Sequence, residues 1–205
     1  MSETSDNRWK CRAKRFSLLT AAVSLWFLFV YGGADWVASQ HSYRIPIGMN
    51  WERNIPYVPA TVVAYMSIYG LFLLAPFLLR QQSELEQFSV ALAVMIGIGG
   101  VVFLLFPGES LFEPLQPQSW QSWIRVADAL NLDNNYLPSL HVGLSVACVT
   151  AYTRRTSPFF SWLLWAWAIA IALSTLLLHE HHVIDVVTGW CLASVCVRYF
   201  LPTNG

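Results

Sequence analysis

Long apolar segments alternate with short polar ones along most of this chain. An α-helix rises about 1.5 Å per residue, so roughly 20 apolar residues suffice to cross the hydrocarbon core of a bilayer. Segments of about this length recur along the sequence. The pattern predicts an all-α protein built as a six-transmembrane helix bundle, with spans at residues 16–38, 56–79, 87–106, 137–153, 157–178 and 181–200.

These segments predict one compact membrane domain over residues 16–200. A basic N-terminal segment, residues 1–15, precedes it, and a short tail, residues 201–205, follows it. The first apolar segment has an alternative interpretation as a cleaved signal peptide. Its charge-free run at 16–34 is longer than the apolar part of a typical signal, which favours an uncleaved first span.

Composition supports the membrane prediction. The chain has 205 residues, of which 56% are hydrophobic and only 12% charged, whereas a soluble domain usually has about 25% charged residues. The net charge is zero, so nothing indicates binding to nucleic acid. The four cysteines have no paired spacing, which argues against a disulfide framework and favours buried apolar packing of Cys148, Cys191 and Cys196.

The positions of lysine and arginine predict the orientation, because cytoplasmic loops carry an excess of them. With both termini in the cytoplasm, the outer side would hold Arg44, Arg53 and Arg125. The inner side would hold Arg8, Lys10, Arg12, Lys14, Arg15, Arg80, Arg154, Arg155 and Arg198. In a bacterium, the protein would then lie in the inner membrane with its outer loops in the periplasm.

The longest connection, residues 107–137, is predicted to lie on the outer face. Long loops in compact domains are often functional. Trp120 and Trp123 suit the membrane interface, and the amphipathic run at 123–132 predicts an interfacial helix beside the site.

Two histidine motifs carry the candidate chemistry. His141 and His181 are 40 residues apart, a separation that fits one helix across the bilayer and a second one back, so both imidazoles would meet at the outer face. Pro138 suits a first helical turn, whose backbone N–H groups attract anions. Ser139 could add a hydroxyl donor there. The alternative is an ordinary capped helix start with an interfacial histidine.

The second motif pairs His181 with Asp185 at i, i+4, on one face of a predicted helix. A carboxylate that accepts the proton of one ring nitrogen leaves the other free as a nucleophile or base. His182 points about 100° away and is a candidate phosphate contact. The alternatives are a structural Asp–His pair and a zinc site formed by His141, His181 and Asp185.

These residues resemble the type 2 phosphatidic acid phosphatase superfamily, whose motifs are PSxH and SRxxxxxHxxxD on a six-span bundle. The first motif corresponds to residues 138–141 and the second to residues 174–185, with the spacing kept. The resemblance implies that His181 attacks phosphorus, that Asp185 orients it and that His141 protonates the leaving oxygen. It implies phosphate contacts from Ser139 and Ser174, and no metal or other cofactor.

Two departures from the family pattern concern the phosphate-binding cations. Thr175 stands where the family usually has an arginine, and the upstream KxxxxxxRP motif is absent from residues 106–114. Arg53 and Arg125 are the candidate replacements, together with His182. A similar loss of arginines, with both histidines and the aspartate kept, is typical of the inositol phosphorylceramide and sphingomyelin synthase branch.

The resemblance implies a metal-independent lipid phosphatase or phosphotransferase acting at the outer face on a phospholipid or a polyprenyl-type phosphate. The first alternative is a transferase that moves a phospho-headgroup to a lipid hydroxyl. The second is a non-catalytic lipid-binding or transport protein on the same fold. The sequence does not specify the lipid, the acceptor or the oligomeric state.

Overall fold

A computed structural model describes residues 3–112, 119–132 and 134–201, with side chains from residue 10 onward. The fold is helical, as predicted, with one small addition of two three-residue strands, β1 (Ile45–Ile47) and β2 (Gly108–Ser110), that pair in parallel. The helices are α1 (Glu3–Ser39), α2 (Val62–Met66), α3 (Ile68–Leu78), α4 (Gln82–Leu105), α5 (Gln121–Leu130), α6 (Leu140–Tyr152), α7 (Pro158–Leu177) and α8 (Val183–Phe200), with short 3-10 turns at Asn50–Asn54, Pro59–Thr61 and Thr153–Arg155.

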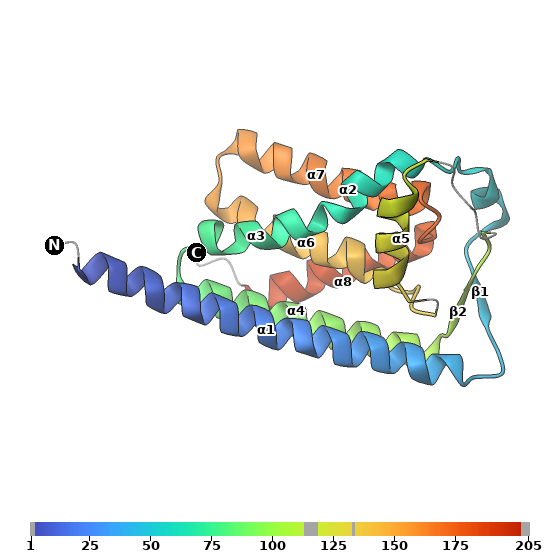
Figure 1. The fold of residues 1–205 in the computed structure, drawn as a ribbon, viewed down its shortest axis with the longest axis horizontal. Coiled ribbons are helices and arrows are strands. Elements are labelled where there is room, and N and C mark those ends of the chain that lie inside the picture. Colours follow the sequence, from blue (N-terminus) through green and yellow to red (C-terminus); the bar gives the residue numbers. More distant parts are fainter. Residues whose placement is uncertain (1–2, 113–118, 133, 202–205) are drawn as a thin grey trace.

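Helix α1 lies lengthwise along α4 at one side of the bundle (Figure 1). It absorbs most of the basic N-terminal segment, because no proline or glycine interrupts the sequence before residue 32. Arg12 donates to the carbonyl oxygens of Pro76 and Leu79 and so satisfies carbonyl groups at the end of α3.

Helix α6 forms the centre of the bundle and packs against α8, α7 and α3. Small residues let it approach α8 closely. A Cβ on Gly143 would lie 3.1 Å from the Gly189 carbonyl oxygen, and a Cβ on Gly189 would collide with the Ser139 carbonyl oxygen. At the far end of α6, the buried Tyr152 hydroxyl donates to the Leu71 carbonyl oxygen at 2.9 Å. Helix α6 is therefore packed closely against α8 and hydrogen-bonded to α3.

Five helical segments in the described chain are long and apolar enough to cross a membrane: Lys10–Ser39, Pro59–Leu78, Gln82–Leu105, Pro158–Leu177 and Val183–Phe200. They correspond to predicted spans one, two, three, five and six. The predicted fourth span corresponds to α6, which has only 13 helical residues and is surrounded by other helices. A count of six spans therefore stays a prediction.

The second span is interrupted between α2 and α3. Ser67 lies at this break, where its hydroxyl donates to the Ala64 carbonyl oxygen at 2.6 Å. The same hydroxyl oxygen accepts the indole N–H of Trp167 at 2.7 Å. The break is thus held by a neighbouring helix, which satisfies polar groups that lipid could not.

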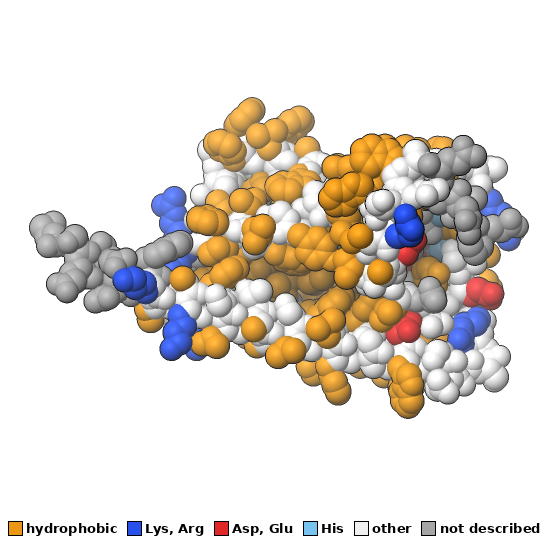
Figure 2. Space-filling model, viewed as in Figure 1, with side chains coloured by type: hydrophobic (Ala, Val, Ile, Leu, Met, Phe, Trp, Pro, Cys, Tyr) orange, Lys and Arg blue, Asp and Glu red, His pale blue; other side chains and the backbone are white. Residues whose placement is uncertain are grey.

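Charged side chains gather at the two ends of the bundle, and hydrophobic ones cover its middle (Figure 2). Helix α1 begins and α8 ends at one end, whereas β1, β2 and α5 lie at the opposite end (Figure 1). The chain is a helical integral membrane protein. Helix α5 confirms the amphipathic helix predicted at 123–132, displaced by two residues, with Ile124 and Ala127 buried and Trp123 exposed. Residues 113–118 and 133 of the predicted outer loop lie outside the described residues.

Candidate active site

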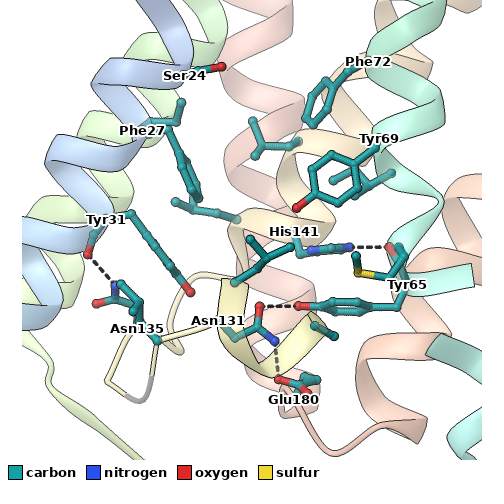
Figure 3. A pocket seen from close by; sticks show the side chains of 18 of the residues that line it. Ser24, Phe27, Tyr31, Tyr65, Tyr69, Phe72, Asn131, Asn135, His141 and Glu180 are labelled. Carbon is teal, nitrogen blue, oxygen red and sulfur yellow. Dashed lines mark hydrogen bonds between the residues drawn. The ribbon is translucent and has the colours of Figure 1, made fainter. Parts of the chain in front are cut away.

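A cavity of about 880 Å³ opens between the helices at the end of the bundle that carries α5. Both His141 and His181 line it, as the 40-residue spacing predicted. From the histidines the cavity continues between α1, α3 and α4, where the lining is mostly apolar, with Phe27, Phe72 and Leu92 among its residues. Figure 3 shows several of the lining side chains directed toward this common space. The site therefore joins a polar end to a long apolar compartment.

His141 lies in the first turn of α6, where its ring is held on two sides. Its Nε2 is 2.8 Å from the Tyr65 carbonyl oxygen, and its ring stacks on the Tyr65 ring at a centroid distance of 3.8 Å (Figure 3). A carbonyl oxygen can only accept, so Nε2 carries the hydrogen in this contact. Nδ1 is then the nitrogen left for proton exchange.

His181 does not share a helix with Asp185, contrary to the i, i+4 prediction. Helix α8 begins at Val183 with His182 as its N-cap, so His181 lies in the preceding loop. The two side chains still meet, because Asp185 turns back toward the start of its own helix. Its Oδ2 accepts the His182 backbone N–H at 2.8 Å and lies 3.5 Å from His181 Nδ1.

His181 Nδ1 and Asp185 Oδ2 are close enough to form an ion pair, but they are not aligned for a hydrogen bond. His181 Nδ1 and Asp185 Oδ1 are both buried without a hydrogen-bond partner. Hydrogen bonds of catalytic groups are often long without substrate and tighten when it binds. The buried His181 imidazole, with a carboxylate behind it that has one oxygen still without a partner, is therefore positioned to gain this bond.

The two motifs are joined directly. The Ser139 backbone N–H donates to the Asp185 carbonyl oxygen at 3.0 Å. The Ser139 hydroxyl oxygen accepts the Val142 N–H at 3.3 Å and so caps α6. Ser139 is fully buried, and Pro138 precedes the cap rather than starting the helix. The observed role of Ser139 is therefore to cap the start of α6 and to hold α6 against α8.

His182 is occupied by protein partners. Its Nδ1 is 3.0 Å from Glu52 Oε2, and its Nε2 accepts the Leu111 backbone N–H at 3.2 Å. The ring is fully buried and is not among the cavity-lining residues. With both nitrogens engaged, His182 anchors the start of α8 instead of facing the cavity.

Sequence reasoning missed Glu52, which is fully buried although it is charged. Besides the contact with His182, its Oε2 accepts the Val183 backbone N–H at 3.0 Å, and its Oε1 accepts the Met49 N–H at 3.0 Å. Glu52 thus caps α8 from a segment 131 residues away. The signal that could have found it is a lone acidic residue in an otherwise weakly charged outer loop, because buried charges need partners.

Phe112 completes this layer beside the cavity. Its ring stacks on His179 at 4.0 Å and on His182 at 4.5 Å. His179 has a left-handed backbone with φ of 61°, and its Nε2 lies 2.9 Å from the Ile55 carbonyl oxygen. The loop before α8 is thereby held by the Phe112 side chain from one outer segment and the Ile55 carbonyl oxygen from another.

The other predicted phosphate contacts do not line the cavity. Ser174 is buried in α7 and donates to the Ile171 carbonyl oxygen, and Thr175 likewise donates to Ala172. Arg53 and Arg125 are exposed outside the cavity. None of the cavity-lining residues in the described chain is a lysine or arginine.

Neutral polar groups and carboxylates occupy the polar end instead. The Tyr65 hydroxyl donates to Asn131 Oδ1 at 2.7 Å, and Asn131 Nδ2 donates to Glu180 Oε2 at 2.6 Å (Figure 3). At the rim, burial and then the carboxylates of Asp128 and Glu180 raise the pKa of the Tyr57 phenol, which keeps it a neutral donor. Two carboxylates, those of Asp128 and Glu180, therefore line this end of the cavity.

The zinc alternative has no assembled ligand set. No group of three histidine, cysteine or carboxylate side chains comes together for a metal ion in the parts of the chain that the structure describes. His141 and His181 line one cavity, and Asp185 Oδ2 lies 3.5 Å from His181 Nδ1, an arrangement that can serve phosphoryl transfer.

Comparison with known proteins agrees with this arrangement. A family model described as the PAP2 superfamily matches residues 52–199, well over half of the chain and all three catalytic candidates. No curated protein matches closely enough to count as a relative. The chain belongs to the PAP2 superfamily of phosphatase-type membrane enzymes.

Proposed function

We propose that this enzyme transfers the phosphate group of a membrane lipid through a phosphohistidine formed on His181. The observation that carries the proposal is the meeting of His141 and His181 on one cavity, with Asp185 directly behind His181. The hydrogen bond from the Ser139 backbone N–H to the Asp185 carbonyl oxygen holds the starts of α6 and α8 together. Such fixed positioning supplies much of the catalysis in phosphoryl transfer.

In the first half-reaction, His181 Nε2 attacks phosphorus while the bond from phosphorus to the leaving oxygen breaks. The proton stays on His181 Nδ1, and the Asp185 carboxylate stabilises the positive charge that develops on the ring. His141, in its protonated form, gives a proton to the leaving oxygen, which departs as an alcohol. The positive end of the α6 dipole, where His141 lies, favours the negative charge of the phosphate group.

In the second half-reaction, an acceptor hydroxyl attacks phosphorus and the bond between phosphorus and His181 Nε2 breaks. Neutral His141 takes the proton of the acceptor and so returns to its protonated form. With water as acceptor the enzyme is a phosphatase, and with a lipid hydroxyl it is a headgroup transferase. The residues that form the intermediate are the same in both cases, and neither case routes a step through a metal ion.

A headgroup transferase is the second candidate function. Its support is the network of Tyr65, Asn131 and Glu180 beside His141, which offers hydrogen-bonding groups to the alcohol part of a headgroup. The apolar compartment between α1 and α3 suits the acyl chains of a lipid.

The site is proposed to face the outer side of the membrane. The starts of α6 and α8, where the histidines lie, are at the end of the bundle opposite the start of α1 (Figure 1). Five of the twelve lysines and arginines belong to residues 8–15, at the start of α1. A charged, membrane-impermeant thiol reagent tests this with single cysteines introduced at Glu109 and Arg80 in a cysteine-free background. Labelling of the first alone in intact cells supports the orientation, and labelling of the second alone reverses it.

Trapping the intermediate tests the mechanism. The purified protein is incubated with phosphate-labelled lipids and quenched in base, which preserves phosphohistidine. We expect label on the native protein and none on His181→Ala. His41→Ala is the matched control, because His41 lies outside the cavity, and it should be labelled like the native protein. Lipid binding by the native protein without any label would support the non-catalytic alternative instead.

A further inference from the structure

Among its described lining residues, the cavity has no lysine or arginine whose permanent charge could balance a phosphate group. Residues 113–118 and 133, which lie outside the description, contain none in the sequence. The histidines are the remaining sources of positive charge. A phosphomonoester carries close to two negative charges at pH 7, whereas a phosphodiester carries one.

Two carboxylates face the same space. Glu180 lines the cavity directly before His181, and Asn131 Nδ2 and the backbone hold it in place, since the Glu180 N–H donates to the Thr175 carbonyl oxygen at 3.0 Å. Asp128 lines the rim on α5. Coulomb repulsion scales with the product of the charges, so each carboxylate repels a dianion twice as strongly as a monoanion at the same distance.

The uncharged polar groups suit the part of a phosphodiester that a phosphomonoester lacks. The Tyr65 hydroxyl and the Asn131 amide lie in one hydrogen-bonded chain that ends on Glu180 (Figure 3). Tyr31 and Asn135 border the same space from α1 and from the loop before α6, where Asn135 Nδ2 donates to the Tyr31 carbonyl oxygen at 2.8 Å. Hydroxyl or ammonium groups of a headgroup alcohol can donate to such a wall.

We propose that the substrate of this cavity is a lipid phosphodiester with a neutral or cationic headgroup alcohol, and that Glu180 selects it against phosphomonoesters. The inference rests on the proposed phosphohistidine chemistry and names the substrate class of the same site. Selection works mainly by repulsion, because the half-buried Glu180 carboxylate beside the nucleophile raises the free energy of a bound dianion more than that of a bound monoanion.

The test compares lipids with identical acyl chains in the same detergent micelles: phosphatidic acid as the monoester, and phosphatidylethanolamine and phosphatidylinositol as diesters. The measured quantities are kcat/KM for diacylglycerol release and the label on His181. We expect the native enzyme to prefer at least one diester. Glu180→Gln should raise the ratio of kcat/KM for phosphatidic acid to that for the diester about tenfold, as removal of one nearby charge implies.

Glu109→Gln is the matched control, because Glu109 is exposed on β2 at the same end of the molecule and does not line the cavity. The ratio of kcat/KM for phosphatidic acid to that for the diester should be the same in Glu109→Gln as in the native enzyme. If Glu180→Gln does not fold, Asp128→Asn on the exposed face of α5 replaces it. We expect Asp128→Asn to raise the same ratio of kcat/KM values, by a smaller factor. A native preference for phosphatidic acid, or equal ratios in the cavity variant and Glu109→Gln, overturns the inference.

The same experiment separates this inference from the proposed function. Label on His181 with phosphatidic acid as the better substrate keeps the mechanism and refutes the substrate class. Diacylglycerol release that persists in His181→Ala refutes the mechanism itself.

Discussion

Glu52 and His182 form a buried pair that supports the reacting residues without touching the cavity. The carboxylate binds His182 Nδ1 and caps α8, and the His182 backbone N–H in turn holds Asp185, whose carboxylate lies behind His181. A buried charge keeps its place only when such partners satisfy it. At the scale of single residues, the position of the nucleophile therefore depends on a carboxylate from a distant loop.

Replacing Glu52 with glutamine tests this support. The amide keeps one acceptor oxygen but removes the charge, so we expect the free energy of unfolding to fall by about 2 kcal/mol, the scale of a hydrogen bond to a charged group. The rate kcat should fall and KM should stay near the native value, because the change displaces Asp185 and His181 rather than the substrate wall. Thermal unfolding and steady-state kinetics measure both effects. A full native kcat in a measurably destabilised variant would show that Glu52 is structural only.

Asp185→Asn tests the orienting anion. Asparagine still accepts the His182 N–H but cannot stabilise a positive charge on His181, so kcat should fall by roughly 10³-fold or more while the fold is retained. Single-turnover labelling of His181 gives the rate of the affected step. A labelling rate within a few fold of native would remove Asp185 from the mechanism.

The choice of leaving group tests His141. His141→Ala should lower kcat by roughly 10²- to 10⁴-fold with a natural lipid, whose alkoxide needs a proton to depart. With a nitrophenyl ester of the same phosphate group the loss should be much smaller, because nitrophenolate departs without protonation. An equal loss with both substrates would mean that His141 only shapes the site.

At the scale of elements, the start of α6 and the start of α8 are one structural unit. Gly189 lets the Ser139 carbonyl approach α8, and the adjacent backbone bond from Ser139 to Asp185 ties the two motifs. The sequence motifs place each histidine near a helix start, but the two residues meet only because these helices pack almost backbone to backbone.

Gly189→Ala should separate these helices. The added Cβ would collide with the Ser139 carbonyl oxygen, so we expect a loss of about 1–3 kcal/mol from overpacking together with reduced activity. Gly32→Ala in α1 is the matched control, because a Cβ there meets nothing within 4 Å. Its stability should be unchanged or slightly higher, since alanine is the better helix former. Thermal unfolding followed by circular dichroism, together with activity assays, measures both variants. Equal stability and activity in Gly189→Ala and Gly32→Ala would contradict the prediction.

At the scale of the whole molecule, the apolar compartment between α1 and α3 links the membrane interior to the histidines. Helix α1 packs mainly on α4 and lies at the edge of the bundle, so one wall of this compartment is a single helix (Figure 1). The long apolar surface and the site at its end thus suit a substrate that stays partly in the bilayer (Figure 2).

Narrowing the compartment should weaken binding of long acyl chains. Ser24 lines it on α1, and Ser24→Phe should displace about two methylenes of a bound chain, which raises KM about tenfold at about 0.8 kcal/mol each. Short-chain substrates should be unaffected. Ser17→Phe is the control on α1 outside the lining, and a chain-length effect equal in both variants would argue against this compartment as the acyl site.

The sequence by itself determined the membrane class, most of the helices and the motif residues that meet. Hydropathy and helix start signals are local, so a run of apolar residues or a capping serine acts within a few neighbours along the chain. The resemblance to the superfamily followed from the spacing of His141, His181 and Asp185, and the family match confirmed it.

Only the tertiary structure decided which polar side chains enter the cavity. Arg53 and Arg125 lie outside it, His182 is turned toward Glu52, and His181 precedes α8 instead of sharing a face with Asp185. The partners that decide these positions are as many as 131 residues away in sequence. Side-chain burial and long-range hydrogen bonds come from how helices pack, and no local pattern encodes that geometry.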